Sequence, residues 1–179
     1  MITSRKELVN AIQSYLTTFP EEDKFRDQFA TLLEDSRCFF RDNLPGHITG
    51  SAFIVDESRT YTLLTHHAKL NKWLQPGGHA DGDENISGVA LRDAKEETGL
   101  NNFSALHNSI FDIDIHLIPA RNNFPEHFHY DIRILLQASR DENYIVSEES
   151  HDLAWISLHD VESITENDSL IRMVRKVLG

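Results

Sequence analysis

Acidic residues at fixed spacing behind a glycine pair, within residues 77–100, constrain this chain more than any other feature. Gly78 is followed after five residues by Glu84, and after seven more by the run Arg-Asp-Ala-Lys-Glu-Glu-Thr-Gly-Leu at residues 92–100. The glycines predict a turn whose backbone can approach a metal or a phosphate closely, because no side chain intervenes. Gly99 predicts the end of a helix, since glycine is common at helix C-caps. We therefore expect a loop followed by a helix.

The expected helix has an acidic face formed by Asp93, Glu96 and Glu97. These side chains fall within an arc of about 100° on a helix that turns about 100° per residue. Clustered carboxylates repel one another unless cations lie between them, and oxygen ligands favour Mg²⁺ or Mn²⁺. An ordinary solvated face is the alternative, since charge-rich exposed helices are common. The spacing and the preceding glycines favour the metal site.

The same stretch resembles the signature of the Nudix hydrolase family, which ends in the run Arg-Glu-U-x-Glu-Glu-x-Gly-U, where U is a bulky aliphatic residue. Six charged or glycine positions match it literally: Gly78, Glu84, Arg92, Glu96, Glu97 and Gly99. Six matches at fixed spacing arise by chance about once in 10⁷ windows. Two positions depart from the pattern, because Asp93 stands where the family has Glu and Ala94 where it has a larger aliphatic residue.

The resemblance implies an enzyme that hydrolyses a nucleoside diphosphate linked to another group, with Mg²⁺ or Mn²⁺ bound across the pyrophosphate. It implies Arg92, Asp93, Glu96 and Glu97 as catalytic residues, and Gly77, Glu84, Asp93, Glu96 and Glu97 as metal-binding positions. Sugar nucleotides or ADP-ribose rank first as substrates, and nucleoside triphosphates second. The alternatives are a non-catalytic nucleotide-binding or regulatory domain, and an enzyme like the isopentenyl diphosphate isomerases. Those isomerases carry a catalytic cysteine where this chain has Gly77.

A general base is expected outside the signature. Its candidates are Glu148, Glu149 and Asp152, which precede a late strand in a region where family members often carry a further acidic residue. Solvated loop carboxylates are the alternative, because acidic loops are common.

The composition restricts the partners of the protein. A formal net charge of −12 argues against binding to duplex nucleic acid, which requires a basic surface. A small phosphorylated nucleotide remains compatible, because bound divalent metals change the local charge. The single cysteine, Cys38, excludes an internal disulfide. No apolar run approaches the length of a membrane span, so we expect no membrane partner and a cytoplasmic location.

The N-terminal segment predicts a pair of helices. Ser4 and Glu7 form a capping box, and apolar residues then recur every four positions as far as Leu16. Pro20 suits the first turn of the second helix. The pair is interpreted as core packing or as a homodimer contact. The expected domains are residues 1–46, a helical extension, and residues 47–179, a Nudix hydrolase domain.

Short strands are expected from His47 onward. Residues 51–55 and 61–65 predict a hairpin, and Trp155 predicts the core anchor of a late strand before a C-terminal helix. This order of elements is similar to the Nudix fold, an α/β fold in which a mixed sheet lies in an α/β/α sandwich. Here the N-terminal helices precede it.

Two strands at residues 112–117 and 127–134 alternate polar and apolar side chains, which predicts one polar face on each strand. A symmetric hairpin around residues 119–126 pairs His116 with His129, Asp114 with Asp131, and Asp112 with Arg133. The two polar faces would then form a wall of imidazoles and carboxylates.

Histidines are frequent, with ten in the chain, and several flank the expected strands and the glycine loop. The candidates for a second, transition-metal site or for the substrate wall are His47, His79, His116, His127, His129 and Asp131. Imidazole is a preferred ligand of Zn²⁺ and related ions, which is why the pattern indicates a metal. A surface or hydrogen-bonded core residue is the alternative for each histidine.

Overall fold

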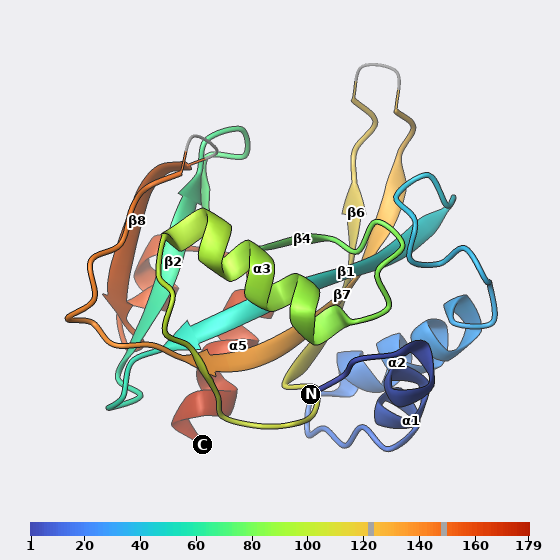
Figure 1. Ribbon diagram of the computed structural model, residues 1–179, viewed down its shortest axis with the longest axis horizontal. Coiled ribbons are helices and arrows are strands. Elements are labelled where there is room, and N and C mark those ends of the chain that lie inside the picture. Colours follow the sequence, from blue (N-terminus) through green and yellow to red (C-terminus); the bar gives the residue numbers. More distant parts are fainter. Residues whose placement is uncertain (122–123, 148–149) are drawn as a thin grey trace. The chain divides into compact units, whose positions relative to one another are not determined.

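The computed structural model describes residues 1–121, 124–147 and 150–179, which cluster into two compact units. The described residues of the first unit lie within residues 1–50, 78–89 and 107–134, and those of the second within 51–77, 90–106 and 135–179. The elements, most of which are labelled in Figure 1, are α1 (Arg5–Gln13), α2 (Pro20–Leu32), β1 (Gly46–Val55), β2 (Tyr61–His67), β3 (Lys72–Leu74), β4 (Gly77–His79), α3 (Ile86–Thr98), β5 (Ser104–Ala105), β6 (Asp112–Ile118), β7 (His127–Gln137), β8 (Ser150–Ser157), α4 (Val161–Ile164) and α5 (Asp168–Leu178).

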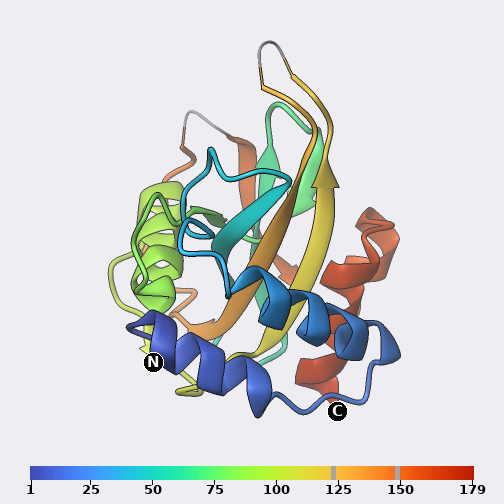
Figure 2. The ribbon, with the colours of Figure 1, turned by 90° about the vertical axis from the view of Figure 1, so that its right-hand side faces the viewer.

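The two predicted N-terminal helices are confirmed as α1 and α2, which pack against each other in the first unit (Figure 2). Ser4 caps α1 by accepting a hydrogen bond from the backbone N–H of Glu7, and Pro20 occupies the first turn of α2. The expected apolar stripe is shorter than predicted. Leu16 is 89% exposed, because α1 ends at Gln13 and the chain turns away from the helical path.

A buried carboxylate connects α2 to β6 within the first unit. Glu22 is fully buried, and its Oε1 accepts hydrogen bonds from the Tyr15 hydroxyl at 2.8 Å and from the backbone N–H of Ile113 at 3.2 Å. The Thr17 hydroxyl donates to its other oxygen. A buried carboxylate is tolerated only when its oxygens are bonded in this way. The N-terminal helices are therefore part of the packing around β6.

The β6–β7 hairpin has the predicted register, with His116 opposite His129, Asp114 opposite Asp131 and Asp112 opposite Arg133. Its polar face, however, is not the open wall that the alternation predicted. All four charged residues of the face are buried, and the guanidinium of Arg133 donates to all three carboxylates, at 2.8 Å to Asp131, 3.0 Å to Asp112 and 3.3 Å to Asp114. Period-two alternation identifies a polar face but not whether other parts of the chain cover it.

The predicted hairpin of the second unit is confirmed, since Ile54 pairs with Leu63 and Val55 with Thr62. Strand β2 also pairs antiparallel with β3 and β8. Trp155 of β8 is only half-buried, and Leu153 and Leu158 are the buried residues of this segment. The prediction that Trp155 anchors the core was therefore wrong. The alternation of polar and apolar residues predicts the face of the strand on which Trp155 lies, but not how deeply its indole is buried.

The turn between β1 and β2 is held by the carboxylate of Asp56. It accepts hydrogen bonds from the backbone N–H groups of Thr60 and Tyr61, at 2.9 and 3.0 Å, and from the Ser58 hydroxyl at 2.6 Å. Burial alone would raise the pKa of Asp56, but the bonds from Ser58, Tyr61 and Thr60 together lower it below its ordinary value.

We expect Asp56→Ala to lower the free energy of unfolding by about 1–3 kcal/mol, because two turn N–H groups lose their acceptor. The stabilisation by Asp56 is present above the pKa of the unfolded chain, about 4, and is lost as the pH falls through the lower pKa of the folded state. Urea unfolding at pH 7 and pH 3 measures both effects. The exposed neighbour Glu57, changed to Ala, serves as the control. A penalty for Asp56→Ala that grows in acid would contradict the assignment.

The strand pairing is mixed. The N–H of Phe128 donates to the carbonyl of Pro45 in the first unit, and the N–H of Ala138 donates to the carbonyl of Val55 in the second. The partners are equally far apart in sequence in both bonds, which requires β1 and β7 to run parallel, whereas the β6–β7 pair is antiparallel. The expected mixed α/β architecture with helices before the sheet is confirmed. Among the described residues, no helix is long and apolar enough to cross a membrane.

Candidate active site

Helix α3 carries the acidic signature, and most of its apolar residues are buried. Four of its apolar side chains have no exposed surface, namely Ile86, Val89, Ala90 and Ala94. Glu96 is exposed and Glu97 is half-buried. The helix ends as predicted at Gly99, which has a φ of 73° and whose N–H donates to the carbonyl of Lys95 at 2.8 Å.

A hydrogen bond connects the glycine pair to the acidic face within the second unit. The N–H of Gly77 donates to Oε1 of Glu97 at 2.8 Å. A Cβ atom at Gly77 would lie 2.3 Å from Oγ of Ser51 and 2.6 Å from its Cα, so only glycine fits here. The bond orients the carboxylate of Glu97. The carbonyl of Gly77, which the signature implies as a metal ligand, remains a prediction.

Asp93, the departure from the family pattern, is held by its neighbour. Its side chain is 12% exposed, and its Oδ1 accepts a hydrogen bond from Nε of Arg92 at 2.9 Å. This is a charge-assisted contact of the kind expected for Arg92. The donor set of the face consists of carboxylate oxygens, which suits a hard divalent cation such as Mg²⁺ or Mn²⁺. Asp93, Glu96 and Glu97 are therefore the residues that would hold it.

Glu84 lies in the first unit and contacts Arg5 of α1. Its carboxylate accepts hydrogen bonds from the backbone N–H of Arg5 at 3.1 Å and from Nε at 3.3 Å. The same guanidinium donates to the carbonyls of Leu33, Asp35 and Ser36. The role of Arg5 was not foreseen, and no sequence signal identifies it, because the two partners are 79 positions apart.

The predicted histidines come together in the first unit. The ring centroid of His47 lies 5.2 Å from that of His79, 5.0 Å from that of His127 and 4.9 Å from that of His129. His116 stands at the edge of this group, 5.4 Å from His129. Burial is the main cause that lowers the pKa of His129 to about 2 and that of His79 to about 4, so both are neutral at pH 7. We call these five residues the histidine cluster.

The remaining candidates are placed differently. Asp131 accepts hydrogen bonds from Arg133 and from the Thr49 hydroxyl, at 2.8 and 2.9 Å, which gives it a structural partner on each side. Asp152 is exposed in β8, and it lies opposite His66 of β2 in the strand register. Its carboxylate accepts a hydrogen bond from the backbone N–H of Leu153. Glu148 and Glu149 lie outside the described residues. The general base therefore remains a prediction.

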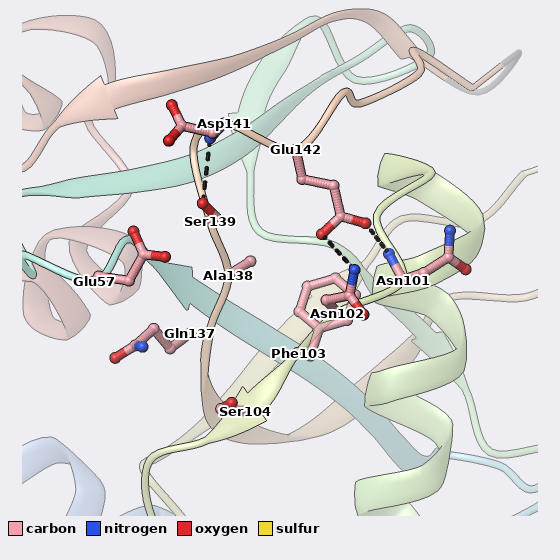
Figure 3. A pocket seen from close by; sticks show the side chains of 10 residues that line it. All are labelled: Glu57, Asn101, Asn102, Phe103, Ser104, Gln137, Ala138, Ser139, Asp141 and Glu142. Carbon is pink, nitrogen blue, oxygen red and sulfur yellow. Dashed lines mark hydrogen bonds between the residues drawn. The ribbon is translucent and has the colours of Figure 1, made fainter.

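A hollow of about 670 Å³ lies in the second unit and contains none of the predicted site residues (Figure 3). Glu142 spans part of it, accepting hydrogen bonds from the backbone N–H of Asn101 at 2.9 Å and from the Asn102 amide at 3.2 Å. Among the described residues that line it, Glu57, Asp141 and Glu142 are acidic and none is basic. Such a lining repels phosphate groups, so we do not assign the hollow to a phosphorylated substrate.

Residues 45–177 match the family model of the NUDIX domain. The chain belongs to the Nudix hydrolase family, whose members act on pyrophosphate bonds, and it is a hydrolase of that kind. The predicted family and fold are thereby confirmed.

Known relatives agree with this assignment. A protein of Lactococcus lactis subsp. cremoris named a probable DHNTP pyrophosphohydrolase is 26% identical over 141 residues, which cover 76% of this chain and 81% of that protein. The fold is similar to that of a C. elegans Ap4A hydrolase in a binary complex, with a TM-score of 0.58, 19% identity, and coverage of 72% of this chain and 93% of that one. It is also similar to the E. coli dihydroneopterin triphosphate pyrophosphohydrolase, with a TM-score of 0.57, 11% identity, and coverage of 72% and 92%.

Proposed function

We propose that the protein hydrolyses the diphosphate linkage of a nucleoside diphosphate joined to another group, with sugar nucleotides and ADP-ribose ahead of nucleoside triphosphates. The observation that carries the proposal is the acidic face of α3, where the Gly77 N–H orients Glu97 and Arg92 holds Asp93. The signature determines the reaction, whereas the second group of the substrate is recognised elsewhere. The ranking of substrates therefore requires a direct test.

The protein groups have defined tasks in this reaction. Glu96 and Glu97 are the principal ligands of the divalent cation, and Asp93 is a third. When bound, the cation neutralises charge on the phosphate oxygens and lowers the pKa of a coordinated water. Gly77 uses its N–H to orient the carboxylate of Glu97. Arg92 positions Asp93, whose chain is one methylene shorter than that of the family glutamate.

A triphosphate such as dihydroneopterin triphosphate is the second candidate substrate. The Lactococcus relative, named for this activity, aligns with three quarters of the chain. The two candidates differ in their products. Hydrolysis of a sugar nucleotide or ADP-ribose releases two organic monophosphates, whereas hydrolysis of a triphosphate next to the organic group releases inorganic pyrophosphate.

A substrate panel with product analysis tests the proposal. The purified protein is incubated with ADP-ribose, a UDP-sugar, nucleoside triphosphates, a dinucleoside polyphosphate and dihydroneopterin triphosphate, each with Mg²⁺ and with Mn²⁺. We expect the highest kcat/KM for a substrate that yields two organic monophosphates. Release of pyrophosphate from a triphosphate as the dominant activity would favour the second candidate. No turnover combined with nucleotide binding would favour a non-catalytic domain.

An isomerase-like activity has no support in the site. Gly77 has no thiol where the isomerases carry their cysteine, and the only cysteine of the chain, Cys38, is fully buried. Burial is the main cause that raises the pKa of Cys38 to about 11, so it stays protonated at neutral pH. A protonated, enclosed thiol is a poor nucleophile.

A further inference from the structure

Three imidazoles of the histidine cluster meet at one point of the first unit. His47 of β1 and His127 and His129 of β7 each offer one ring nitrogen, and these atoms all lie within 4.8 Å of one another. His47 has no exposed surface and His127 is 6% exposed. His129 is half-buried, so two of the three rings are enclosed by the fold.

The hydrogen bonds of two of these rings determine which nitrogen carries the proton. Nδ1 of His47 lies 3.3 Å from the carbonyl oxygen of Asn43, and Nδ1 of His127 lies 2.9 Å from that of Pro125. A carbonyl oxygen only accepts, so each Nδ1 is the donor and each neutral ring has its lone pair on Nε2. Metal-binding histidines typically donate their other N–H to a backbone carbonyl in this way.

Two of the nitrogens have no partner that would explain their burial. Nε2 of His47 and Nε2 of His129 are enclosed and form no hydrogen bond with any residue that the structure describes. A buried polar atom without a partner is unfavourable, and such atoms in native proteins commonly mark a bound ion or water. Two of them within one group of three imidazoles indicate a shared ligand with vacant acceptor orbitals.

We propose that His47, His127 and His129 bind a transition-metal ion, with Zn²⁺ as the favoured ion, at a site distinct in its ligands from the carboxylate face of α3. Three nitrogen donors without a carboxylate favour Zn²⁺, Co²⁺ or Ni²⁺ over Mg²⁺ and Mn²⁺. Tetrahedral nitrogen ligands at about 2.0–2.1 Å from Zn²⁺ stand about 3.4 Å apart, so small side-chain rotations close the observed group onto the ion. Three protein ligands leave one coordination position for water or another ligand.

Metal analysis of untagged protein, purified without chelators, tests the proposal. After removal of metals with EDTA, the protein is titrated with Zn²⁺, and with Co²⁺ to record the visible absorbance of a tetrahedral site. We expect one equivalent of Zn²⁺ to bind and to raise the Tm. Failure of the wild-type protein to bind stoichiometric Zn²⁺ would overturn the proposal, whatever the variants do.

Variants locate the bound ion. His127→Gln and His129→Gln should each weaken Zn²⁺ binding by about 100-fold or more, since even indirect contacts to such ligands contribute about 10–100-fold to affinity. His107→Gln, at an exposed histidine outside the cluster, should bind as the wild type does. Glu97→Gln should also retain the Zn²⁺ site, which separates it from the carboxylate face. Unchanged binding in both cluster variants, or loss of binding in Glu97→Gln, would refute the assignment.

Discussion

We expect Glu97→Gln to lower kcat by about 10³-fold or more at saturating Mg²⁺, because it removes the charge of a proposed metal ligand from the acidic face. The substitution is nearly isosteric. The amide oxygen of glutamine can still accept the hydrogen bond that the Gly77 N–H donates to Oε1 of Glu97, so the loop geometry is preserved. The loss therefore reports on the carboxylate charge and not on folding. Steady-state kinetics over a range of Mg²⁺ concentrations measures it.

Glu142→Gln is the matched control for this experiment. Glu142 is a half-buried carboxylate in the same unit that also accepts a hydrogen bond from a backbone N–H, that of Asn101, at 2.9 Å. It lies outside the signature, so its conversion to glutamine should change kcat less than about twofold. Full activity of Glu97→Gln at saturating Mg²⁺ would eliminate Glu97 as a metal ligand.

Arg133→Met should lower the free energy of unfolding by about 3–5 kcal/mol, the largest stability effect we expect in this chain. Arg133 is almost fully buried, and its guanidinium donates to Asp112, Asp114 and Asp131. Burial by itself would lower the pKa of Arg133, but the three carboxylates raise it above its ordinary value. Removing the cation deprives three enclosed carboxylates of the positive charge that they share, and that loss is strongly unfavourable.

Arg37→Met is the control, because Arg37 also donates to a carboxylate in the first unit. Its two bonds to Asp42, at 2.7 and 2.8 Å, are between side chains that are 55% and 66% exposed. An exposed pair of this kind contributes about 0–1 kcal/mol. Urea unfolding of both variants gives the comparison. If Arg133→Met were no less stable than Arg37→Met, the charges around Arg133 would have to be compensated by other groups.

Much of the local structure could be predicted because its determinants are adjacent in sequence. The cap of α1 by Ser4 and the end of α3 at Gly99 each depend on a few neighbouring residues. The register of β6 and β7 also followed from local information. The symmetric hairpin around residues 119–126 predicted the observed pairs, and a slip by one residue would have turned the side chains of one strand to the opposite face.

The degree of burial of a side chain, and its contacts with residues that are distant in sequence, could not be predicted in the same way. The alternation in β7 marks Arg133 as polar-facing, but its burial depends on parts of the chain that lie far from it in sequence. Trp155 follows the pattern of its strand and is nevertheless only half-buried. The signature acids of α3 were readily identified because they lie within one helix. The histidines were identified through strand spacing, and their convergence became visible only in the structure.

The contact between Arg5 and Glu84 connects the N-terminal helix α1 to a residue of the signature. The family match begins at residue 45, so it does not include the helices α1 and α2. Yet Glu84, a residue of the signature, takes two of its hydrogen bonds from the first turn of α1. A shortened protein that begins at the family boundary would lack the guanidinium and the backbone N–H that Glu84 binds. Arg5 thus provides a counter-charge for Glu84 of the signature, although Arg5 lies outside the residues that match the family model.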